Sequence, residues 1–161
     1  FFRGEVDKYT WQEVGSSFLP GEIIAAFLWA QLQEADDITR QRLKLWSGYH
    51  AALEPLERQG LLRRPVVPVG CQHNAHMYYV RINPELDRQE VLSQMKSHGV
   101  HAVFHYVPLH NAPAAQRYAR VAGGMSVTER QAACLIRLPL WIGMSEAQQQ
   151  RVVTALRCSI Q

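Results

Sequence analysis

The sequence has few cysteines, no long apolar run and no common nucleotide or hydrolase motif. Its three cysteines, Cys71, Cys134 and Cys158, are odd in number and have no CxxC spacing. This pattern is typical of free thiols in a reducing cytoplasm and argues against a disulfide framework or a zinc ribbon. The longest apolar run, around Ile23–Ala30, is too short to span a bilayer, and no signal peptide opens the chain. GxSxG, Walker, GxGxxG and HExxH motifs are also absent.

Lysine is scarce, and none of the three lysines stands where a nucleophile would be expected. Lys8 falls in a polar loop, while Lys44 and Lys96 fall in helical patterns and are expected to be solvated. A lysine nucleophile needs a desolvated pocket or a cationic neighbour, so the sequence predicts no such residue. The other basic residues are scattered arginines, adjacent only at Arg63 and Arg64. Nucleic-acid binders cluster such charge on one face, so nucleic acid is not an expected partner.

The composition is that of a globular domain. With 161 residues, 47% hydrophobic and 19% charged, the chain can bury a real core. It begins with Phe-Phe rather than Met, which leads us to expect a piece of a longer protein.

Hydrophobic spacing predicts an α/β (α+β) fold. Residues 1–19 lack a clear period and are expected to form an extended loop. Pro20 suits a first helical turn, and the apolar spacing that follows it runs to about Gly60. This pattern predicts either one long helix or two helices broken near Asp36 and Asp37.

The rest of the chain alternates predicted strands and helices. Arg63–Gly70 is expected to be a proline-containing connector. Asp87, Ser126 with Glu129, and Ser145 are expected to cap helices, and Gly99 to end one. This order predicts a two-layer arrangement, in which about three strands are covered on one face. The predicted strands are His76–Ile82, Val100–Tyr106 and Leu135–Leu140, and the predicted helices are Leu86–His98, Ala112–Val121, one after Ser126, and Ser145–Arg157.

Three histidines near the middle of the chain, His101, His105 and His110, leave three interpretations open. A metal site would need further ligands, and no carboxylate lies between His98 and Arg120. The histidines can instead be ordinary strand and loop residues. In the third interpretation His105, Tyr106 and His110 are polar donors around an anionic or sugar ligand, because Pro108 turns the chain between them.

The first 19 residues contain a second group of candidates. Gly15, Ser16 and Ser17 precede a predicted helix start and can cradle a phosphate or simply cap the helix. Arg3, Lys8, Tyr9 and Trp11 can bind a pyrophosphate and stack on a base, or coat a surface loop. The sequence alone favours neither interpretation.

Several segments together resemble one enzyme family. FFRGEVDKYTW, GSS, AAFLWAQL, NAHMYYV, AVFHYVPLH and RLPL occur in this order through nearly all of the chain. They are similar to the C-terminal portion of the DegT/DnrJ/EryC1/StrS sugar aminotransferases. The resemblance implies pyridoxal 5'-phosphate as cofactor and transfer of the amino group of glutamate to C4 of a dTDP-4-keto-6-deoxy sugar. It also implies a cytoplasmic homodimer with the active site at the subunit interface.

The resemblance further implies a division of the chain. Residues 1–19 would be an active-site loop on the large-domain side, residues 20–60 a long interdomain helix, and residues 61–161 a small domain with a short, mostly antiparallel sheet. The Schiff-base lysine would lie upstream of Phe1, so this chain would hold no catalytic residue and would be inactive alone.

The resemblance also assigns roles to the candidate residues. The family's Asn-x-Arg pattern falls here on Ser17 and Leu19, which leaves Ser17 as the candidate contact to the cofactor phosphate. The substrate candidates are Arg3, Lys8, Tyr9, His105, Tyr106 and His110. The competing hypothesis is a non-catalytic binding or regulatory module with a ferredoxin-like fold. An upstream reading frame that encodes a pyridoxal lysine would distinguish the two.

Overall fold

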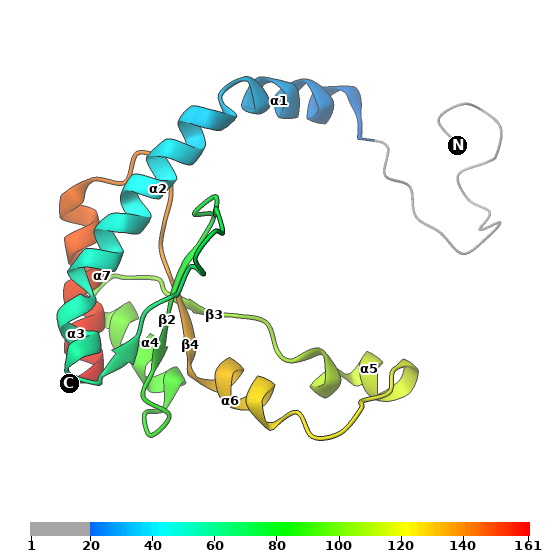
Figure 1. The fold of residues 1–161 in the computed structure, drawn as a ribbon, viewed down its shortest axis with the longest axis vertical. Helices are drawn as coiled ribbons and strands as arrows, with labels where there is room; N and C mark the ends of the chain where they lie inside the picture. The colour runs from blue at the N-terminus through cyan, green and yellow to red at the C-terminus, as the bar shows by residue number, and fades with distance from the viewer. Residues whose placement is uncertain (1–19) are drawn as a thin grey trace. The chain divides into compact units, whose positions relative to one another are not determined.

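The computed structural model describes residues 20–161, without the side chains of residues 113, 114 and 116 (Figure 1). The chain divides into two compact units, residues 1–35 and residues 36–161.

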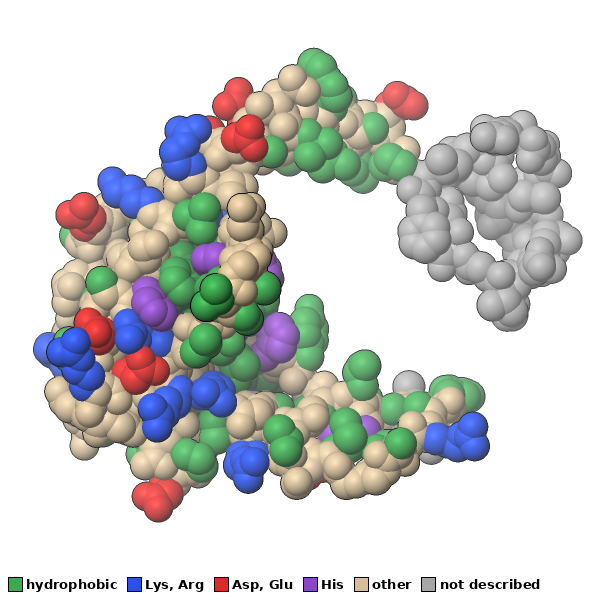
Figure 2. Space-filling view, in the orientation of Figure 1, with side chains coloured by type: hydrophobic (Ala, Val, Ile, Leu, Met, Phe, Trp, Pro, Cys, Tyr) green, Lys and Arg blue, Asp and Glu red, His purple; other side chains and the backbone are tan. Residues whose placement is uncertain are grey.

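The described part of the first unit is helix α1 (Glu22–Gln33), which buries none of its residues. Its N-cap is Gly21, so Pro20 precedes the helix and does not lie in its first turn as the sequence predicted. Hydrophobic side chains gather along α1 in the space-filling view (Figure 2). The large exposed ones are Ile23, Ile24, Phe27, Leu28, Trp29 and Leu32.

Of the two helical alternatives, the interrupted one is correct. Helix α1 ends before Glu34, and α2 (Ala35–Ala52) begins immediately after it. The break therefore falls at Glu34, two residues before Asp36. A short helix, α3 (Glu54–Arg58), continues from α2 and ends before Gly60, whose positive φ of 77° suits a residue without a Cβ.

The second unit is built on a four-stranded antiparallel sheet in the order β1-β2-β4-β3. The strands are β1 (Leu62–Arg63), β2 (Tyr78–Ile82), β3 (Val103–Phe104) and β4 (Leu135–Leu138). The predicted connector Arg63–Gly70 was wrong at its start, since Arg63 pairs with Arg81 in β1. A strand of two residues is too short to show the alternation of apolar and polar side chains, so the sequence did not predict it.

The strand predicted for Val100–Tyr106 is reduced to two residues. The Ala102 N–H donates to the Val100 carbonyl, which tightens the backbone before β3 and interrupts pairing. His101 and His105 therefore do not belong to one regular strand. The predicted strand Leu135–Leu140 is also shorter and ends at Leu138.

Helix caps were predicted with mixed success. Asp87 caps α4 (Arg88–Ser97) and Ser145 caps α7 (Glu146–Ile160), both as expected. The predicted capping box of Ser126 with Glu129 is wrong. Helix α6 (Ser126–Cys134) starts one residue earlier than that box requires, because its N-cap is Met125 and not Ser126, while Glu129 pairs with His110. Between β3 and α6 lie a short 3-10 helix, η1 (Leu109–Asn111), and α5 (Pro113–Tyr118).

The core lies on one side of the sheet. Val80, Ile136 and Leu138 point into it and pack with residues of α2, α4 and α7. Strand residues alternate between buried and half-buried along β2 and β4, so Tyr79, Arg81 and Arg137 lie on the other face. The predicted fold class, a two-layer α/β arrangement with a short antiparallel sheet, is confirmed. Among residues 20–161, no helix has the length and apolar composition needed to cross a membrane.

Candidate functional site

Two pockets flank strand β3 and the loop that follows it, and they share Phe104, Tyr106 and Val107. The first, here called the Arg88 pocket, has a volume of about 230 Å³ and is also lined by Pro108, Asn111 and Glu129. The second, the Arg137 pocket, has a volume of about 520 Å³ and is lined by Val103, Phe104, His105, Tyr106, Val107, Leu109 and Arg137. Both pockets belong entirely to the second unit.

These pockets gather the polar atoms that the fold leaves without partners. Among the described side chains, the buried nitrogen and oxygen atoms that lack a hydrogen-bond partner are Arg88 Nε, His105 Nδ1 and Arg137 Nε. All three residues line one of the two pockets. Buried polar groups are nearly always paired in native proteins, and an exception calls for an explanation such as an absent ligand.

Of the predicted donors, His105 and Tyr106 both line the Arg137 pocket, and their rings meet edge to face with centroids 5.1 Å apart. Tyr106 is 79% exposed and lies between the two pockets, which leaves its hydroxyl open to a ligand. His110 lines neither pocket. Its Nε2 lies 3.0 Å from Glu129 Oε1, so a carboxylate distant in sequence engages this imidazole. The structure thus brings His105 and Tyr106 together and holds His110 against the Arg88 pocket through Glu129.

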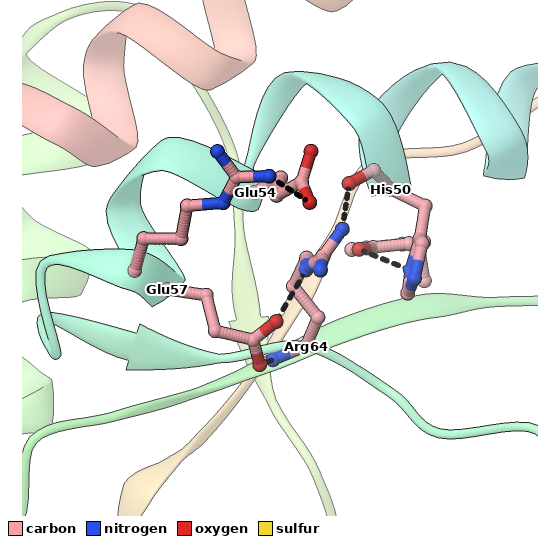
Figure 3. Close-up of polar contacts among 6 residues, drawn as sticks. His50, Glu54, Glu57 and Arg64 are labelled. Carbon is pink, nitrogen blue, oxygen red and sulfur yellow. Dashed lines mark hydrogen bonds and ion pairs between the residues drawn. The ribbon is translucent and has the colours of Figure 1, made fainter.

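A third pocket, of about 450 Å³, lies beside the residues here called the Arg64 cluster: Trp46, His50, Glu57, Arg64 and Tyr78. Arg64 Nε donates to Glu57 Oε2 at 2.6 Å, and the Arg64 backbone N–H donates to Glu57 Oε1 at 2.8 Å. Arg64 Nη1 also donates to the His50 carbonyl oxygen (Figure 3). The imidazole of His50 stacks on Trp46 and lies 3.3 Å from the Tyr78 hydroxyl.

The electrostatics of the Arg64 cluster are those of a structural network. Burial and the nearby Arg64 charge lower the pKa of His50, which favours the neutral imidazole. Burial alone would raise the pKa of Glu57, but its hydrogen bonds from Arg64 outweigh burial and lower it. Burial raises the pKa of Tyr78 far above the physiological range. Because its main charges are paired internally, this cluster is a weaker candidate for a ligand site than the β3 pockets.

The remaining sequence candidates do not form a site within the described chain. Arg3, Lys8, Tyr9 and Ser17 lie outside the described residues. The described lysines, Lys44 and Lys96, are both exposed on helices. Among residues 20–161, no group of three His, Cys, Asp or Glu side chains is placed to hold a metal ion.

A comparison with known families decides what kind of protein this fold belongs to. The model of the DegT/DnrJ/EryC1/StrS aminotransferase family matches residues 2–157. The chain belongs to this family. The matched family is one of aminotransferases.

Solved structures of aminotransferases have the same fold. A DegT DnrJ EryC1 StrS aminotransferase from Brucella abortus is 24% identical, with a TM-score of 0.77 over 98% of this chain. DesV from S. venezuelae, solved in complex with a ketimine intermediate, is 26% identical, with a TM-score of 0.78 over 98% of this chain. NtdA from Bacillus subtilis, solved with bound cofactor PMP, is 24% identical, with a TM-score of 0.65 over 76% of this chain.

This chain corresponds to only part of each of these proteins. It covers 40% of the Brucella enzyme, 42% of DesV and 28% of NtdA. Its fold matches the C-terminal part of fold-type I aminotransferases.

Sequence reasoning missed two pocket arginines, Arg88 and Arg137. A signal for Arg137 was present, because it stands alone as a charged residue in the apolar strand Leu135–Leu138. Arg88 gave no such signal, since it lies in the first turn of an amphipathic helix. It joins the Arg88 pocket because its guanidinium stacks 5.1 Å from the Phe104 ring centroid.

Proposed function

We propose that this chain is the C-terminal part of a pyridoxal phosphate-dependent nucleotide-sugar aminotransferase. The family match over residues 2–157 is the observation that carries the proposal. Within the family, we propose a dTDP-4-amino-4,6-dideoxygalactose transaminase, which moves the amino group of glutamate to C4 of dTDP-4-keto-6-deoxyglucose to make a precursor of enterobacterial common antigen. The closeness of FFRGEVDKYTW and FHYVPLH to this enzyme supports that substrate.

The described residues do not fit the covalent site of the cofactor. A Schiff-base lysine must be held in a dry pocket, whereas Lys44 and Lys96 are solvent-exposed. We therefore assign no step on the cofactor to these residues and propose that its lysine lies in a preceding domain. Ser17 stays a proposed contact to the cofactor phosphate.

The chemistry proposed for this chain is substrate binding and orientation. His105 and Tyr106 offer ring and hydroxyl donors at the Arg137 pocket, and Glu129 fixes the imidazole of His110 through its Nε2. A sugar diphosphate presents many acceptor oxygens, which such donors suit. We propose that Arg3, Lys8 and Tyr9 contribute further substrate contacts.

We also propose a cytoplasmic homodimer with the active site at the interface. The exposed hydrophobic side chains of α1 support association, because apolar patches of this kind usually mark contact surfaces. Sedimentation of the full-length protein should give a dimer, and a clean monomer at high concentration would contradict this part of the proposal.

The full-length protein tests the activity directly. Supplied with pyridoxal phosphate, glutamate and dTDP-4-keto-6-deoxyglucose, it should form 2-oxoglutarate and an amino-sugar nucleotide, with nitrogen at C4 by NMR. The 161-residue chain, as the matched control, should form neither. Nitrogen at C3, or no product from the full-length protein, would contradict the proposed reaction.

Separate half-reactions test the substrate residues. In the full-length protein, His110→Ala and Tyr106→Phe should each worsen KM or kcat for the sugar nucleotide several-fold, because each removes a donor near the substrate. The half-reaction with glutamate should stay nearly unchanged. Equal damage to both half-reactions, or none to either, would count against these assignments.

A further inference from the structure

The residues opposite Arg137 on the two neighbouring strands carry no negative charge that would neutralise its guanidinium. It stands on β4 between Ile136 and Leu138, whose side chains are buried in the core on the other face of the sheet. Its partners across the strands are Tyr79 on β2 and Val103 on β3. Side chains directly opposite each other share a face of the sheet, so the cross-strand neighbours of Arg137 are a phenol and an alkyl group.

The Arg137 pocket contains no acidic side chain. Within the described residues, the ion pairs use Arg40 with Asp37, Arg58 with Glu54, Arg64 with Glu57, and His110 with Glu129. Arg137 takes part in none of them, and its buried Nε has no acceptor. A guanidinium carries five donors and no acceptor, so only an acceptor or an anion can satisfy it.

His105 provides a second unpaired nitrogen in the same pocket. Its Nδ1 is buried without a partner, and an imidazole nitrogen that carries hydrogen can donate to an oxyanion. The rest of the lining is mostly apolar, from Val103, Phe104, Val107 and Leu109. A pocket of about 520 Å³ with a mostly apolar lining and the polar groups of Arg137, His105 and Tyr106 has the size and character of a small-molecule site.

We propose that Arg137 and His105 bind an oxyanion group of a substrate, whose carbon part covers the apolar wall of the Arg137 pocket. This inference rests on the proposed function, which offers two sources of the same chemistry. One is the diphosphate of the nucleotide sugar, and the other is a carboxylate of glutamate. Arg137 and carboxylate or phosphate oxygens can form two parallel hydrogen bonds, which fixes orientation as well as charge.

The test is calorimetric binding to the full-length, cofactor-loaded protein with two probes. Inorganic pyrophosphate represents the diphosphate, and glutarate represents glutamate without the amino group that would react. Arg137→Gln should weaken binding of one probe about tenfold or more, as expected for losing a charge-assisted hydrogen bond. Arg137→Lys should lose part of that affinity, because it keeps the charge but not the planar fork.

Arg81→Gln is the matched control. Arg81 lies on the same face of the sheet, but its Nη1 donates to Gln131 Oε1 at 2.6 Å, so its replacement should leave both affinities unchanged. Selective loss of pyrophosphate binding would assign the diphosphate, and selective loss of glutarate binding would assign the carboxylate. Thermal unfolding of each variant checks that it is folded, and Arg137→Lys replaces Arg137→Gln if the latter is not.

Three results would overturn the inference: no binding of either probe by the unaltered protein, no effect of the Arg137 variants, or equal losses in the Arg137 and Arg81 variants. Failure of the proposed function is measured separately by the sugar transamination assay. A protein that transaminates the sugar while Arg137→Gln binds both probes normally would keep the function and lose the oxyanion site. If the protein fails to transaminate the sugar but Arg137→Gln loses pyrophosphate binding, the oxyanion site is supported and the proposed function is contradicted.

Discussion

The Arg64 cluster and the β3 pockets contain similar residue types but differ in how their polar groups are paired. In the Arg64 cluster, Arg64 donates to both a carboxylate and a backbone carbonyl, and His50 lies against a phenol. In the β3 pockets, Arg88, His105 and Arg137 each keep a buried nitrogen without a partner. The difference teaches that an arginine or histidine in a pocket indicates a ligand only when the fold does not already satisfy it. The four predictions below test this contrast through stability.

The largest effect is expected from Arg64→Gln, which leaves the partly buried Glu57 without its charged partner. The side chains of Arg64 and Glu57 are only 15% and 23% exposed, so the free energy of unfolding should fall by about 2–3 kcal/mol. Urea unfolding measures the change. Arg63→Gln, at the exposed neighbouring position, is the control and should stay within about 0.5 kcal/mol of the unaltered protein. Equal losses in the two variants would mean that pairing does not distinguish them.

A smaller loss is expected from Tyr49→Phe. The Tyr49 hydroxyl donates to the Pro139 carbonyl oxygen at 2.7 Å, and the ring is fully buried in the core. Removing the hydroxyl should cost about 1 kcal/mol of unfolding free energy, because the carbonyl loses a buried donor. Tyr79→Phe, at a half-buried position on strand β2, should cost less in the same measurement. No loss in Tyr49→Phe would mean that this hydrogen bond makes no net contribution to the free energy of unfolding.

The third prediction concerns pH. Because the pKa of His50 is lowered in the folded state, the unfolded state binds this proton more readily. The stability contributed by neutral His50 is present above its ordinary pKa of about 6.5 and is lost as the pH falls through that value toward the lower, folded-state pKa. His50→Asn, which keeps a polar atom near the Nδ1 position, should flatten the pH dependence of unfolding free energy in this window. Identical slopes in the two proteins would contradict the lowered pKa.

The smallest effect on stability is expected from Arg137→Gln. Since the buried Nε of Arg137 has no partner and its guanidinium takes part in none of the ion pairs among the described residues, its replacement should leave the free energy of unfolding within about 0.5 kcal/mol or raise it slightly. Binding residues commonly carry such a stability cost. A loss as large as that of Arg64→Gln in the same urea titration would mean that Arg137 is structural, and the contrast between the two regions would disappear.

Much of the fold was predictable because local signals agree with the tertiary structure. The predicted strand His76–Ile82 and the caps Asp87 and Ser145 depend on residues a few positions apart; both caps were confirmed, and the strand forms over Tyr78–Ile82. Predictions failed where distant residues decide. Ser126 and Glu129 have the spacing of a capping box, but Glu129 instead contacts His110, 19 residues away.

The candidate site shows the same division. The sequence singled out His105, Tyr106 and His110 through the segment FHYVPLH, and two of them line one pocket. It could not rank Arg137 above Arg64, since both are arginines within or beside strands. Which of the two is paired depends on where Glu57 and the His50 carbonyl lie in space.

The sequence by itself determined the family, the antiparallel two-layer fold and the positions of several helix ends, because these follow from motifs and from periodicity within short segments. Only the tertiary structure decided which charged groups are satisfied. Pairing requires two atoms within hydrogen-bond distance, and residues far apart in the chain reach that distance only when the sheet and helices pack. For that reason the unpaired nitrogens of Arg88, His105 and Arg137 become visible only in the folded protein.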